Sequence, residues 1–403
     1  MSVVIAGAGP AGLALSYLLA RNGVSVTLLE REHDFDRVFR GEGLMPSGVD
    51  ALLQMGLGGL LLSLPFRKLE SWDLFIEGRD IMSVPEPFEE LGDRAMRIIP
   101  QTPFLEGMVA KAAEFANFRI LRGADVRDLT WENDRVTGLV ANTEQGETTI
   151  KADLVVGCDG RGSLVRTRAG VKLKLLPVQY DILWFKMPAP ADLLDHCRMM
   201  MYASNARMAL SYTSWDGRLQ FAVMQRKGER LKLTAREWAE DIGRATPAWM
   251  TNHLRSVADS IEGPTHLNVL VGRGETWAIP GLLLIGDAAH PMSPIRAQGI
   301  NLALRDAIVA ANNLVPVLKV GNDPEAIDAA ARAVQAEREP EIVRSQTLQD
   351  RDTRGIGTWY APVLIGLAKF LGPIMGKYPW AQRAWLEQQR DLRFGSREVR
   401  LTA

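Results

Sequence analysis

The sequence of 403 residues predicts an α/β fold: a discontinuous parallel-sheet domain, an inserted antiparallel β-sheet and a C-terminal helical segment. Three glycine-containing motifs, each directly after an apolar run typical of a buried strand, are the first observation. They are Gly7-Ala8-Gly9-Pro10-Ala11-Gly12, Cys158-Asp159-Gly160 and Gly286-Asp287-Ala288. The second observation is a change, between the second and third motifs, from strand–helix units to alternating strands. The chain is therefore expected to leave the parallel sheet and return to it.

The first motif lies within a strand–turn–helix–strand unit. Residues 2–6 are apolar and mostly β-branched, residues 13–20 follow a helical pattern, and residues 24–29 form a second strand that ends at Glu30. This order is that of a Rossmann-like unit for binding dinucleotides, in which the helix N-terminus faces the pyrophosphate. The residues expected to hold the pyrophosphate are Gly7, Gly9, Pro10, Ala11 and Gly12. We assign Glu30 to the ribose, with Arg31 beside it; a carboxylate there favours FAD or NAD over NADP.

The second motif follows a strand expected at residues 153–157. The carboxyl end of such a strand is where open α/β sheets hold ligands, so Asp159 and Gly160 are expected at the nucleotide. Arg161 and Arg166 would supply positive charge for phosphate. The alternative is that Asp159 only caps the helix that follows.

The three motifs together resemble those of the single-component (class A) FAD-dependent aromatic monooxygenases, of the para-hydroxybenzoate hydroxylase and ubiquinone-biosynthesis hydroxylase type. The resemblance covers about residues 1 to 345 and implies FAD, with NAD(P)H as a transient reductant bound in part at the second motif. It implies that Asp287 binds the ribityl chain and that Pro294 lies against the isoalloxazine ring. The amides of a helix opening near Gly299 would face the flavin N1–C2=O edge, where reduced flavin is negative. The residues assigned to this edge are Ala297, Gln298, Gly299, Ile300 and Asn301.

Further positions are assigned by the same resemblance. Arg40 matches a loop arginine that contacts the flavin, Gln101 a position that opens a helix and binds the FAD chain, and Val126 a backbone contact to the adenine. Arg296 departs from the family, whose members usually carry glycine near this position. One interpretation is that its guanidinium faces solvent or the FAD phosphates. The other is that it helps to hold anionic reduced flavin or an acidic substrate. His290 is expected to pack locally rather than to take part in the chemistry.

Between these segments, residues 180–187, 197–202, 206–212 and 219–225 have the pattern of antiparallel strands, which residues 71–76 could join. Methionine and aromatic side chains are frequent there and are suited to an apolar cavity over the flavin. We assign Trp184, Met201, Tyr212 and Met224 to the substrate. The predicted domains are residues 1–70, 97–175 and 264–345 for FAD, and 71–96 and 176–263 for substrate. Residues 346–403 are predicted to form a helical cover.

Composition narrows the class of protein further. A net charge of −1 does not favour nucleic acid, and two cysteines form neither a disulfide framework nor a metal site. A reducing, cytoplasmic setting is therefore predicted. The apolar segment 360–375 is short for a bilayer span; it is expected to cover the cavity or form a dimer interface, with peripheral membrane contact left open.

The function predicted from these features is that of a monooxygenase. The resemblance implies that NAD(P)H and O2 are used to hydroxylate or epoxidise a small hydrophobic aromatic, polyketide-like or isoprenoid substrate through a flavin C4a-hydroperoxide. The alternatives are a flavin-dependent reductase of prenyl double bonds and a non-catalytic FAD-binding protein. A flavin halogenase is disfavoured, because the chain has only Trp277-Ala278-Ile279-Pro280 in place of the halogenase Trp-x-Trp-x-Ile-Pro motif.

Overall fold

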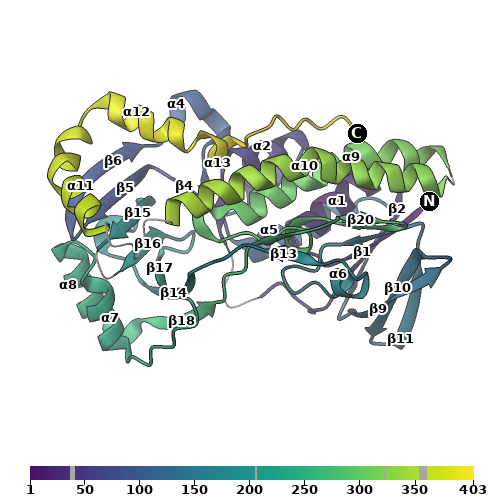
Figure 1. Cartoon of the computed structure of the whole chain (residues 1–403), viewed down its shortest axis with the longest axis horizontal. Coiled ribbons are helices and arrows are strands. Elements are labelled where there is room, and N and C mark those ends of the chain that lie inside the picture. The colour runs from purple at the N-terminus through teal and green to yellow at the C-terminus, as the bar shows by residue number, and fades with distance from the viewer. Residues whose placement is uncertain (37–40, 205–206, 322, 354–360) are drawn as a thin grey trace.

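The computed structural model describes residues 1–36, 41–204, 207–321, 323–353 and 361–403 (Figure 1).

The first layer of the protein is a mostly parallel six-stranded sheet. Only β20 runs antiparallel to its neighbour β21, and the other pairings are parallel. The strand order is β20 (Ala278–Ile279), β21 (Leu282–Leu284), β12 (Leu154–Gly157), β1 (Ser2–Ala6), β2 (Ser25–Glu30) and β8 (Phe118–Arg122). The chain thus returns to this sheet after long excursions, as the motifs predicted.

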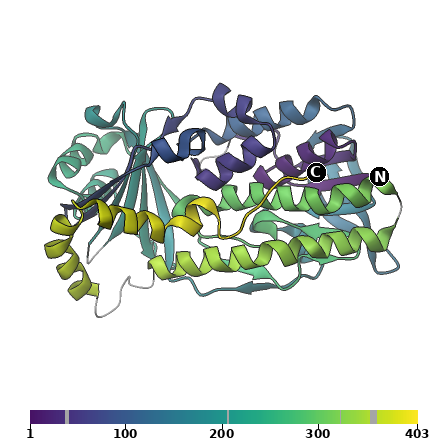
Figure 2. The same cartoon turned by 90° about the horizontal axis from the view of Figure 1, so that it is seen from above.

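Helices pack on this sheet through a continuous apolar core. The long helices α9 and α10 run side by side along the molecule (Figures 1 and 2), and α9 also contacts α1. The core between α1, α9 and the sheet includes Leu13, Leu18, Ile5 and Leu304, all fully buried. The helices of this half are α1 (Pro10–Arg21), α2 (Pro46–Gln54), α3 (Gly58–Ser63), α5 (Gln101–Ala113), α6 (Leu164–Arg168), α9 (Gln298–Val320) and α10 (Pro324–Thr353).

Three small sheets accompany the six-stranded one. A three-stranded meander, not predicted from the sequence, contains β9 (Asp125–Glu132), β10 (Arg135–Thr143) and β11 (Gly146–Lys151). The other two sheets join the halves of the molecule. They contain β13 (Leu173–Leu175) with β19 (Gly272–Gly274), and β3 (Gly43–Leu44) with β7 (Arg97–Ile98) and β4 (Arg67–Lys68).

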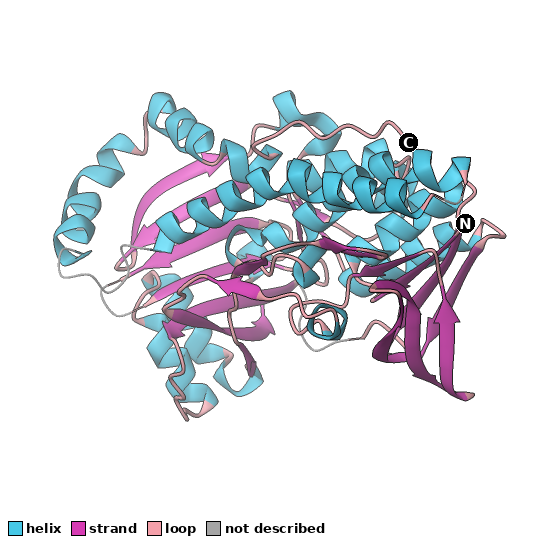
Figure 3. Ribbon diagram, turned by 45° about the vertical axis from the view of Figure 1, so that its right-hand side comes forward, coloured by secondary structure: helices cyan, strands magenta, loops and turns pink. Residues whose placement is uncertain are grey.

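A seven-stranded sheet forms the other half of the molecule (Figure 3). Its order is β18 (Glu262–Leu267), β14 (Tyr180–Pro188), β17 (Arg218–Arg226), β16 (Met208–Thr213), β15 (Arg198–Ala203), β5 (Ser71–Ile76) and β6 (Arg79–Pro85). The strand at residues 71–76 does join the sheet, but parallel to β15 rather than antiparallel. Strands β6 and β18 were not predicted. In β18, Glu262, Gly263 and Pro264 interrupt the alternation of apolar and polar residues that is typical of a strand. Strand β18 spans the boundary predicted at residue 264.

Alternation along the strands gives this sheet two different faces. Phe185, Tyr202 and Phe221 pack against α7 (Ala235–Gly243) and α8 (Ala248–Ser256), where Trp238 is buried. The intervening residues point to the opposite face, toward the six-stranded half of the molecule. One face is therefore ordinary core, and the other is available to form a site.

The C-terminal segment crosses the seven-stranded sheet and then returns along the molecule. Helix α11 (Ala361–Met375) and α12 (Pro379–Gln388) lie against β6, with α4 (Phe88–Leu91) nearby in Figure 1. Helix α13 (Arg390–Phe394) follows, and the buried Arg393 pairs there with Glu86. The chain ends beside α1, where Arg21 donates to the Ala403 carbonyl at 3.3 Å. Among the described helices, none combines the length and apolarity needed to span a bilayer.

Candidate active site

The three motifs meet at one edge of the parallel sheet. Strands β1, β12 and β21 are adjacent and in register, with Ala6 opposite Gly157 and Gly157 opposite Leu284. Gly7 has φ +98°, and a Cβ there would lie 2.6 Å from the Cys158 carbonyl oxygen. A Cβ on Gly286 would lie 3.1 Å from the Ala11 Cβ. The motifs therefore touch one another at the carboxyl ends of their strands, where such sheets bind ligands.

The first motif has the geometry of an anion cradle. Gly9 caps α1 and Pro10 is the first helical residue, a position where the missing amide proton is not needed. A Cβ on Gly12 would lie 2.0 Å from the Gly7 carbonyl oxygen, so the turn closes only with glycine there. A Cβ on Gly9 would meet nothing within 4 Å, so the space in front of the helix is open. The buried Ala11 completes this first turn.

Glu30 and Arg31 lie at the end of β2 but face different surroundings. Glu30 is buried and accepts hydrogen bonds from the Ala8 amide at 2.9 Å and the Glu32 amide at 3.1 Å. The side chain of Arg31 is exposed and pairs with Glu32 at 2.9 Å. The structure therefore ties Glu30 to the first motif and turns Arg31 toward solvent.

The second motif is organised as a helix start. Asp159 accepts from the Ser163 hydroxyl at 2.5 Å and from the Val165 amide at 3.0 Å, at the N-terminus of α6. Arg166 is buried, and its guanidinium donates to the carbonyls of Ala288 at 2.8 Å and Arg161 at 2.9 Å. Burial lowers the pKa of Arg166. Arg166 thus links the second motif to the third, and contact of these side chains with phosphate stays a prediction.

Gly160 adds open space to the second motif. Its φ is +83°, and a Cβ there would meet nothing within 4 Å. The carboxylate of Asp287, on the short helix Gly286–Ala288, is only partly exposed, and burial raises its pKa. Both residues lie at the strand ends that face the cradle.

The turn at Pro294–Ala297 has an unusual backbone. Arg296 (φ 62°, ψ 21°) and Ala297 (φ 50°, ψ 40°) are both left-handed, a conformation that glycine adopts without strain. This is the physical reason why the family resemblance implies glycine near Arg296. The guanidinium carbon of Arg296 lies 5.6 Å from the centre of the Trp385 ring, and one of its nitrogens is 3.7 Å from the Met201 sulfur.

Polar side chains at the start of α9 hold this turn in place. Gln298 is buried and donates to the carbonyls of Arg296 at 2.7 Å and Leu392 at 2.8 Å. Asn301 accepts from the Met45 amide at 2.9 Å and donates to the Ala297 carbonyl at 2.5 Å. The two side chains therefore support the turn from behind.

The remaining predicted residues are Gly299, Ile300, Gln101, Val126 and Arg40, and each has different surroundings. Gly299 lies in open space in the first turn of α9, whereas Ile300 packs on the core. Gln101 is the first residue of α5 and is buried, and its Oε1 has no hydrogen-bond partner among the described residues. Val126 is on β9, opposite Ala141, and Arg40 lies outside the described residues. The Gln101 amide oxygen is therefore able to accept a hydrogen bond from a bound cofactor.

These observations fit FAD. A Cβ on Gly9, on Gly160 or on Gly299 would meet nothing within 4 Å, so the first motif, the second motif and the start of α9 each have a glycine beside open space. The N-termini of α1 and α9 would supply amide groups and positive dipole ends for the pyrophosphate and the flavin. The unpartnered oxygen of Gln101 would supply a further polar contact.

The four predicted substrate residues lie on one face of the seven-stranded sheet. Trp184, Met201 and Tyr212 share an apolar cluster with Ala297, and Met224 shares another with Trp184 and Ile295. The rings of Trp184 and Tyr212 are 6.3 Å apart, edge to face. The structure thus brings these residues to the turn where the flavin is expected.

Glu42 was not predicted to have a role of its own. It lies just before β3, is buried, and accepts from the Ser214 hydroxyl at 2.7 Å. Burial raises the pKa of Glu42 to about 7, and the nearby Asp216 acts in the same direction. The partners are 172 residues apart in sequence, so no local signal reveals the pair.

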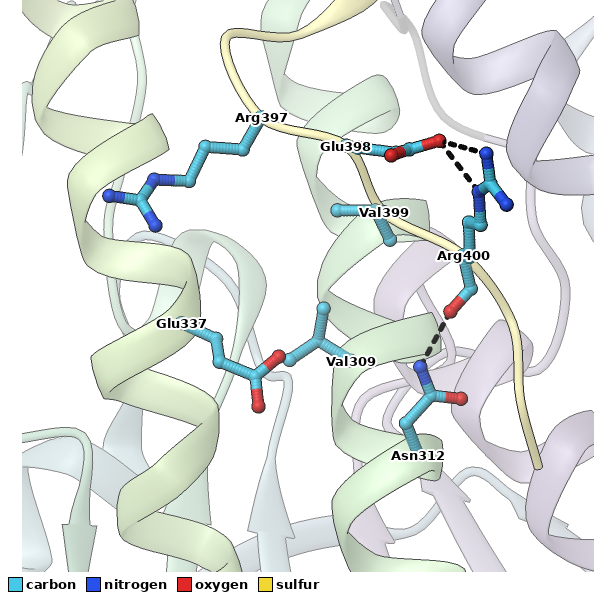
Figure 4. A pocket seen from close by; sticks show the side chains of 7 residues that line it. All are labelled: Val309, Asn312, Glu337, Arg397, Glu398, Val399 and Arg400. Carbon is cyan, nitrogen blue, oxygen red and sulfur yellow. Dashed lines mark hydrogen bonds and ion pairs between the residues drawn. The ribbon is translucent and has the colours of Figure 1, made fainter.

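A separate hollow of about 140 Å³ lies away from this site, between α9, α10 and the C-terminal tail (Figure 4). Asn312 donates there to the Arg400 carbonyl at 2.7 Å, and Arg400 pairs with Glu398. None of the motif residues lines it.

The comparisons identify the family. The chain belongs to the FAD binding domain family, whose model matches residues 1–341. It is 34% identical over 364 residues to 6-methylpretetramide 4-monooxygenase of Streptomyces rimosus, a match that covers 87% of this chain and 83% of that protein. It is 25% identical over 366 residues to squalene monooxygenase 1,2 of Brassica napus, covering 86% of this chain and 67% of that protein.

The fold agrees with this identification. The crystal structure of p-nitrophenol 4-monooxygenase PnpA from Pseudomonas putida DLL-E4 superposes with a TM-score of 0.81 at 18% identity, covering 98% of both chains. The protein is therefore an FAD-dependent monooxygenase, and NAD(P)H and O2 are its co-substrates, as is general in the family.

Proposed function

We propose that this monooxygenase hydroxylates a hydrophobic aromatic or polyketide-like substrate, with 6-methylpretetramide as the first compound to test. The observation that carries the proposal is the apolar face formed by Trp184, Met201, Tyr212 and Met224 against the turn at Ile295–Ala297. Aromatic and methionine side chains on one sheet face suit a flat, apolar ligand. The 34% identity over 87% of the chain supports the same class of substrate.

The proposed roles of the residues follow from their placement. FAD supplies the redox and oxygen chemistry when it is bound. The cradle of Gly7, Gly9 and Gly12 would hold its pyrophosphate, with Glu30 at the ribose. The amides that open α9 would stabilise negative charge on the flavin, and Pro294 would lie against its ring. The apolar sheet face would exclude water from the reacting atoms.

The test is turnover with 6-methylpretetramide as the probe. Purified, FAD-loaded protein should oxidise NAD(P)H faster when the probe is present, and the product should gain the mass of one oxygen atom. A product that has gained no oxygen, or has gained or lost two hydrogens, would reject hydroxylation. Trp184→Ala should raise KM more than it lowers the rate of flavin reduction, because the proposal places Trp184 at the substrate.

Epoxidation of an isoprenoid is the second candidate, because the chain also resembles squalene monooxygenase over 86% of its length. Parallel assays with squalene distinguish the two reactions. An epoxide from squalene, with no product from the aromatic probe, would favour the second candidate.

The division of the chain is part of the proposal. We propose residues 1–70, 97–175 and 264–345 for FAD binding, and 71–96 and 176–263 for substrate, with 346–403 as a cover. Support for the cover comes from Trp385 and Leu386, which pack on the substrate-side cluster, and from the 5.7 Å separation of the Trp72 and Trp385 rings.

We also propose that the outer side of the C-terminal helices contacts a membrane surface. The exposed apolar side chains there are Leu367, Phe370, Leu371, Ile374, Met375, Tyr378 and Trp380. Aromatic residues beside an apolar helix face are typical of membrane interfaces. Co-flotation with anionic vesicles tests the proposal, and loss of flotation in Phe370→Glu is expected. A dimer in size-exclusion chromatography that Phe370→Glu converts to a monomer would assign this face to a second copy instead.

Cys158 and Cys197 are unpaired, which supports the proposed cytoplasmic setting.

A further inference from the structure

The guanidinium of Arg296 lies between the seven-stranded sheet and the C-terminal cover. One of its nitrogens is 3.7 Å from the sulfur of Met201 on β15, and its carbon is 5.6 Å from the ring centre of Trp385 on α12. All three side chains are half-buried. Of the two interpretations that the sequence left open for Arg296, this placement favours the one in which the guanidinium holds an anion at the site.

The backbone of Arg296 is unusual for a residue that carries a side chain. Its φ of 62° and ψ of 21° lie in the left-handed region, where a Cβ costs conformational energy that glycine would not. Residues held in such conformations are concentrated at ligand-binding sites, where the surrounding structure offsets the cost. The backbone conformation thus supports a binding role for Arg296 independently of its side-chain contacts.

The cover holds Trp385 in a fixed position. The Trp385 ring lies 5.7 Å from the ring of Trp72, which is buried on β5. The Trp72 Nε1 donates to Glu86 at 3.0 Å, and Glu86 also pairs with Arg393, a few residues after Trp385 in the same C-terminal segment. Trp385 is therefore joined to the seven-stranded sheet by a series of contacts that begins and ends in the cover.

The same segment is joined to the turn that carries Arg296. Gln298 is buried, and its amide donates to the Leu392 carbonyl on α13 at 2.8 Å and to the Arg296 carbonyl at 2.7 Å. One buried amide thereby couples the backbone of Arg296 to the cover. A guanidinium that is ordered in advance loses less conformational entropy when it binds a ligand.

The groups next to the guanidinium suit the recognition of an anion. A thioether is a weak acceptor, so the N–H group directed at Met201 gains when a carboxylate or ionised enol oxygen takes the place of the sulfur. A guanidinium donates to such a pair of oxygens in a planar, bidentate geometry that an ammonium group does not offer. The indole ring of Trp385 attracts the same cation and limits its orientation.

We propose that Arg296 binds an acidic substituent, a carboxylate or an ionised enol, on the planar aromatic substrate, and that Trp385 is the positioning residue that holds the guanidinium for it. The proposal rests on the function proposed above and specifies its substrate class further. The rings of the substrate would lie along Trp184 and Met201, with the acidic oxygens at the guanidinium. A hydrophobic aromatic compound without such a group would lack this contact.

The test is equilibrium binding of two probes that share one ring system but differ in charge, 2-naphthoate and 2-naphthamide, to the FAD-loaded protein. Isothermal titration calorimetry at neutral pH gives the two dissociation constants. The wild type should bind the carboxylate about 10-fold more tightly than the amide, because hydrogen bonds between charged groups are the stronger ones. Arg296→Gln should lose this preference by weakening binding of the carboxylate alone. Arg296→Lys keeps the charge but not the bidentate geometry, and should retain part of the preference.

Further variants separate positioning from a general effect on structure. Trp385→Ala should reduce the preference for the carboxylate, and Trp385→Phe, which keeps an aromatic ring beside the guanidinium, should restore most of it. Arg383→Gln is the matched control, because it removes an exposed arginine from the same helix and should leave both dissociation constants unchanged. Binding of the amide does not depend on the charge of Arg296, so it reports in every variant that the site is intact.

Equal affinity of the wild type for the two probes, or a preference that persists in Arg296→Gln, would overturn the proposal. A preference lost in Trp385→Ala and not restored in Trp385→Phe would remove Trp385 as the positioning residue. If the preference depends on Arg296 but the turnover product gains no oxygen, hydroxylation is rejected and the anion site stands.

Discussion

His290 Nε2 lies 2.7 Å from the Asp306 carboxylate, which also accepts the Gly286 amide at 3.0 Å. Arg338 donates to the other carboxylate oxygen at 2.7 Å, and the Trp277 ring lies 4.9 Å from the imidazole. All of these side chains are buried. His290 therefore packs and hydrogen-bonds locally, as expected, and fixes the third motif to α9 and α10.

Asp306→Asn should destabilise the protein strongly, because a buried carboxylate that pairs with both Arg338 and His290 would be lost, and Arg338 would keep only Glu341 as an anionic partner. A loss of about 3–5 kcal/mol in the free energy of unfolding is expected, measured by urea denaturation. Asp259→Asn breaks an exposed pair with Arg236 and should leave stability almost unchanged. An equal loss of unfolding free energy in both variants would contradict the expectation that a buried ion pair contributes more to stability than an exposed one.

Acid should remove the stabilisation of the folded state that the Asp306 carboxylate provides. Burial opposes ionisation of Asp306, but His290 and Arg338 lower its pKa to about 2. Since this is below the unfolded value of about 3.9, the stabilisation is complete above pH 4 and is lost as the pH falls toward 2. The difference in stability between wild type and Asp306→Asn should shrink over this range.

Gly9→Ala and Gly12→Ala should separate ligand binding from folding. A Cβ at position 9 meets only open space, so that apoprotein should unfold like the wild type but bind FAD at least 10-fold more weakly. A Cβ at position 12 would overlap the Gly7 carbonyl, so that variant should lose stability with or without FAD. Equilibrium unfolding and flavin fluorescence titration measure the two effects. Unchanged FAD affinity in Gly9→Ala would argue against the cradle.

Gln101→Met should weaken FAD binding without harming the apoprotein. The Gln101 Oε1 is buried without a partner, so its removal should leave the apoprotein at least as stable. Loss of one hydrogen bond to FAD should raise Kd about 5- to 10-fold, measured by fluorescence titration. Wild-type affinity in this variant would place Gln101 outside the cofactor site.

Arg296→Gly should have two opposite effects. Glycine removes the strain of a left-handed backbone, so the apoprotein should become more stable by about 1 kcal/mol. If the guanidinium stabilises anionic reduced flavin, the reduction potential of bound FAD should fall. Trp385→Ala keeps the charge but removes its stacking partner, and serves as the comparison. An unchanged potential in Arg296→Gly would reject the electrostatic role.

Glu42→Gln should alter the dependence of stability on pH. The folded-state pKa of about 7 is above the unfolded value of about 4.3, so the wild type loses stability as the pH rises from 4 to 8. A shift of this size corresponds to about 3–4 kcal/mol. The variant cannot ionise, so its stability relative to wild type should improve toward pH 8. Parallel curves for the two proteins would show that Glu42 does not titrate in this range.

The first strand–turn–helix–strand unit could be predicted closely, because glycine spacing and apolar runs are local signals. Residues 2–6 and the glycines after them lie where the sequence predicted, and the six-stranded sheet is re-entered at β12 and β21. Strands β6 and β18 and the meander β9–β11 were missed; charged residues interrupt the pattern of β6 and β9, and Gly263 and Pro264 interrupt that of β18. The parallel pairing of β5 with β15 depends on which strand edge is free, and sequence does not encode that locally.

Sequence alone determined which residue types can cradle a dinucleotide: a side chain at Gly7 or Gly12 would collide with the backbone, so glycine at these places specifies the turn. Tertiary structure alone decided which distant groups meet. In the folded chain, Tyr212 and Ser214 hydrogen-bond to Glu42, and the guanidinium of Arg166 donates to backbone carbonyls. The ring of Trp385 packs against the guanidinium of Arg296. The reason is that burial and hydrogen-bond geometry depend on the packing of segments hundreds of residues apart, whereas glycine spacing acts within a single turn.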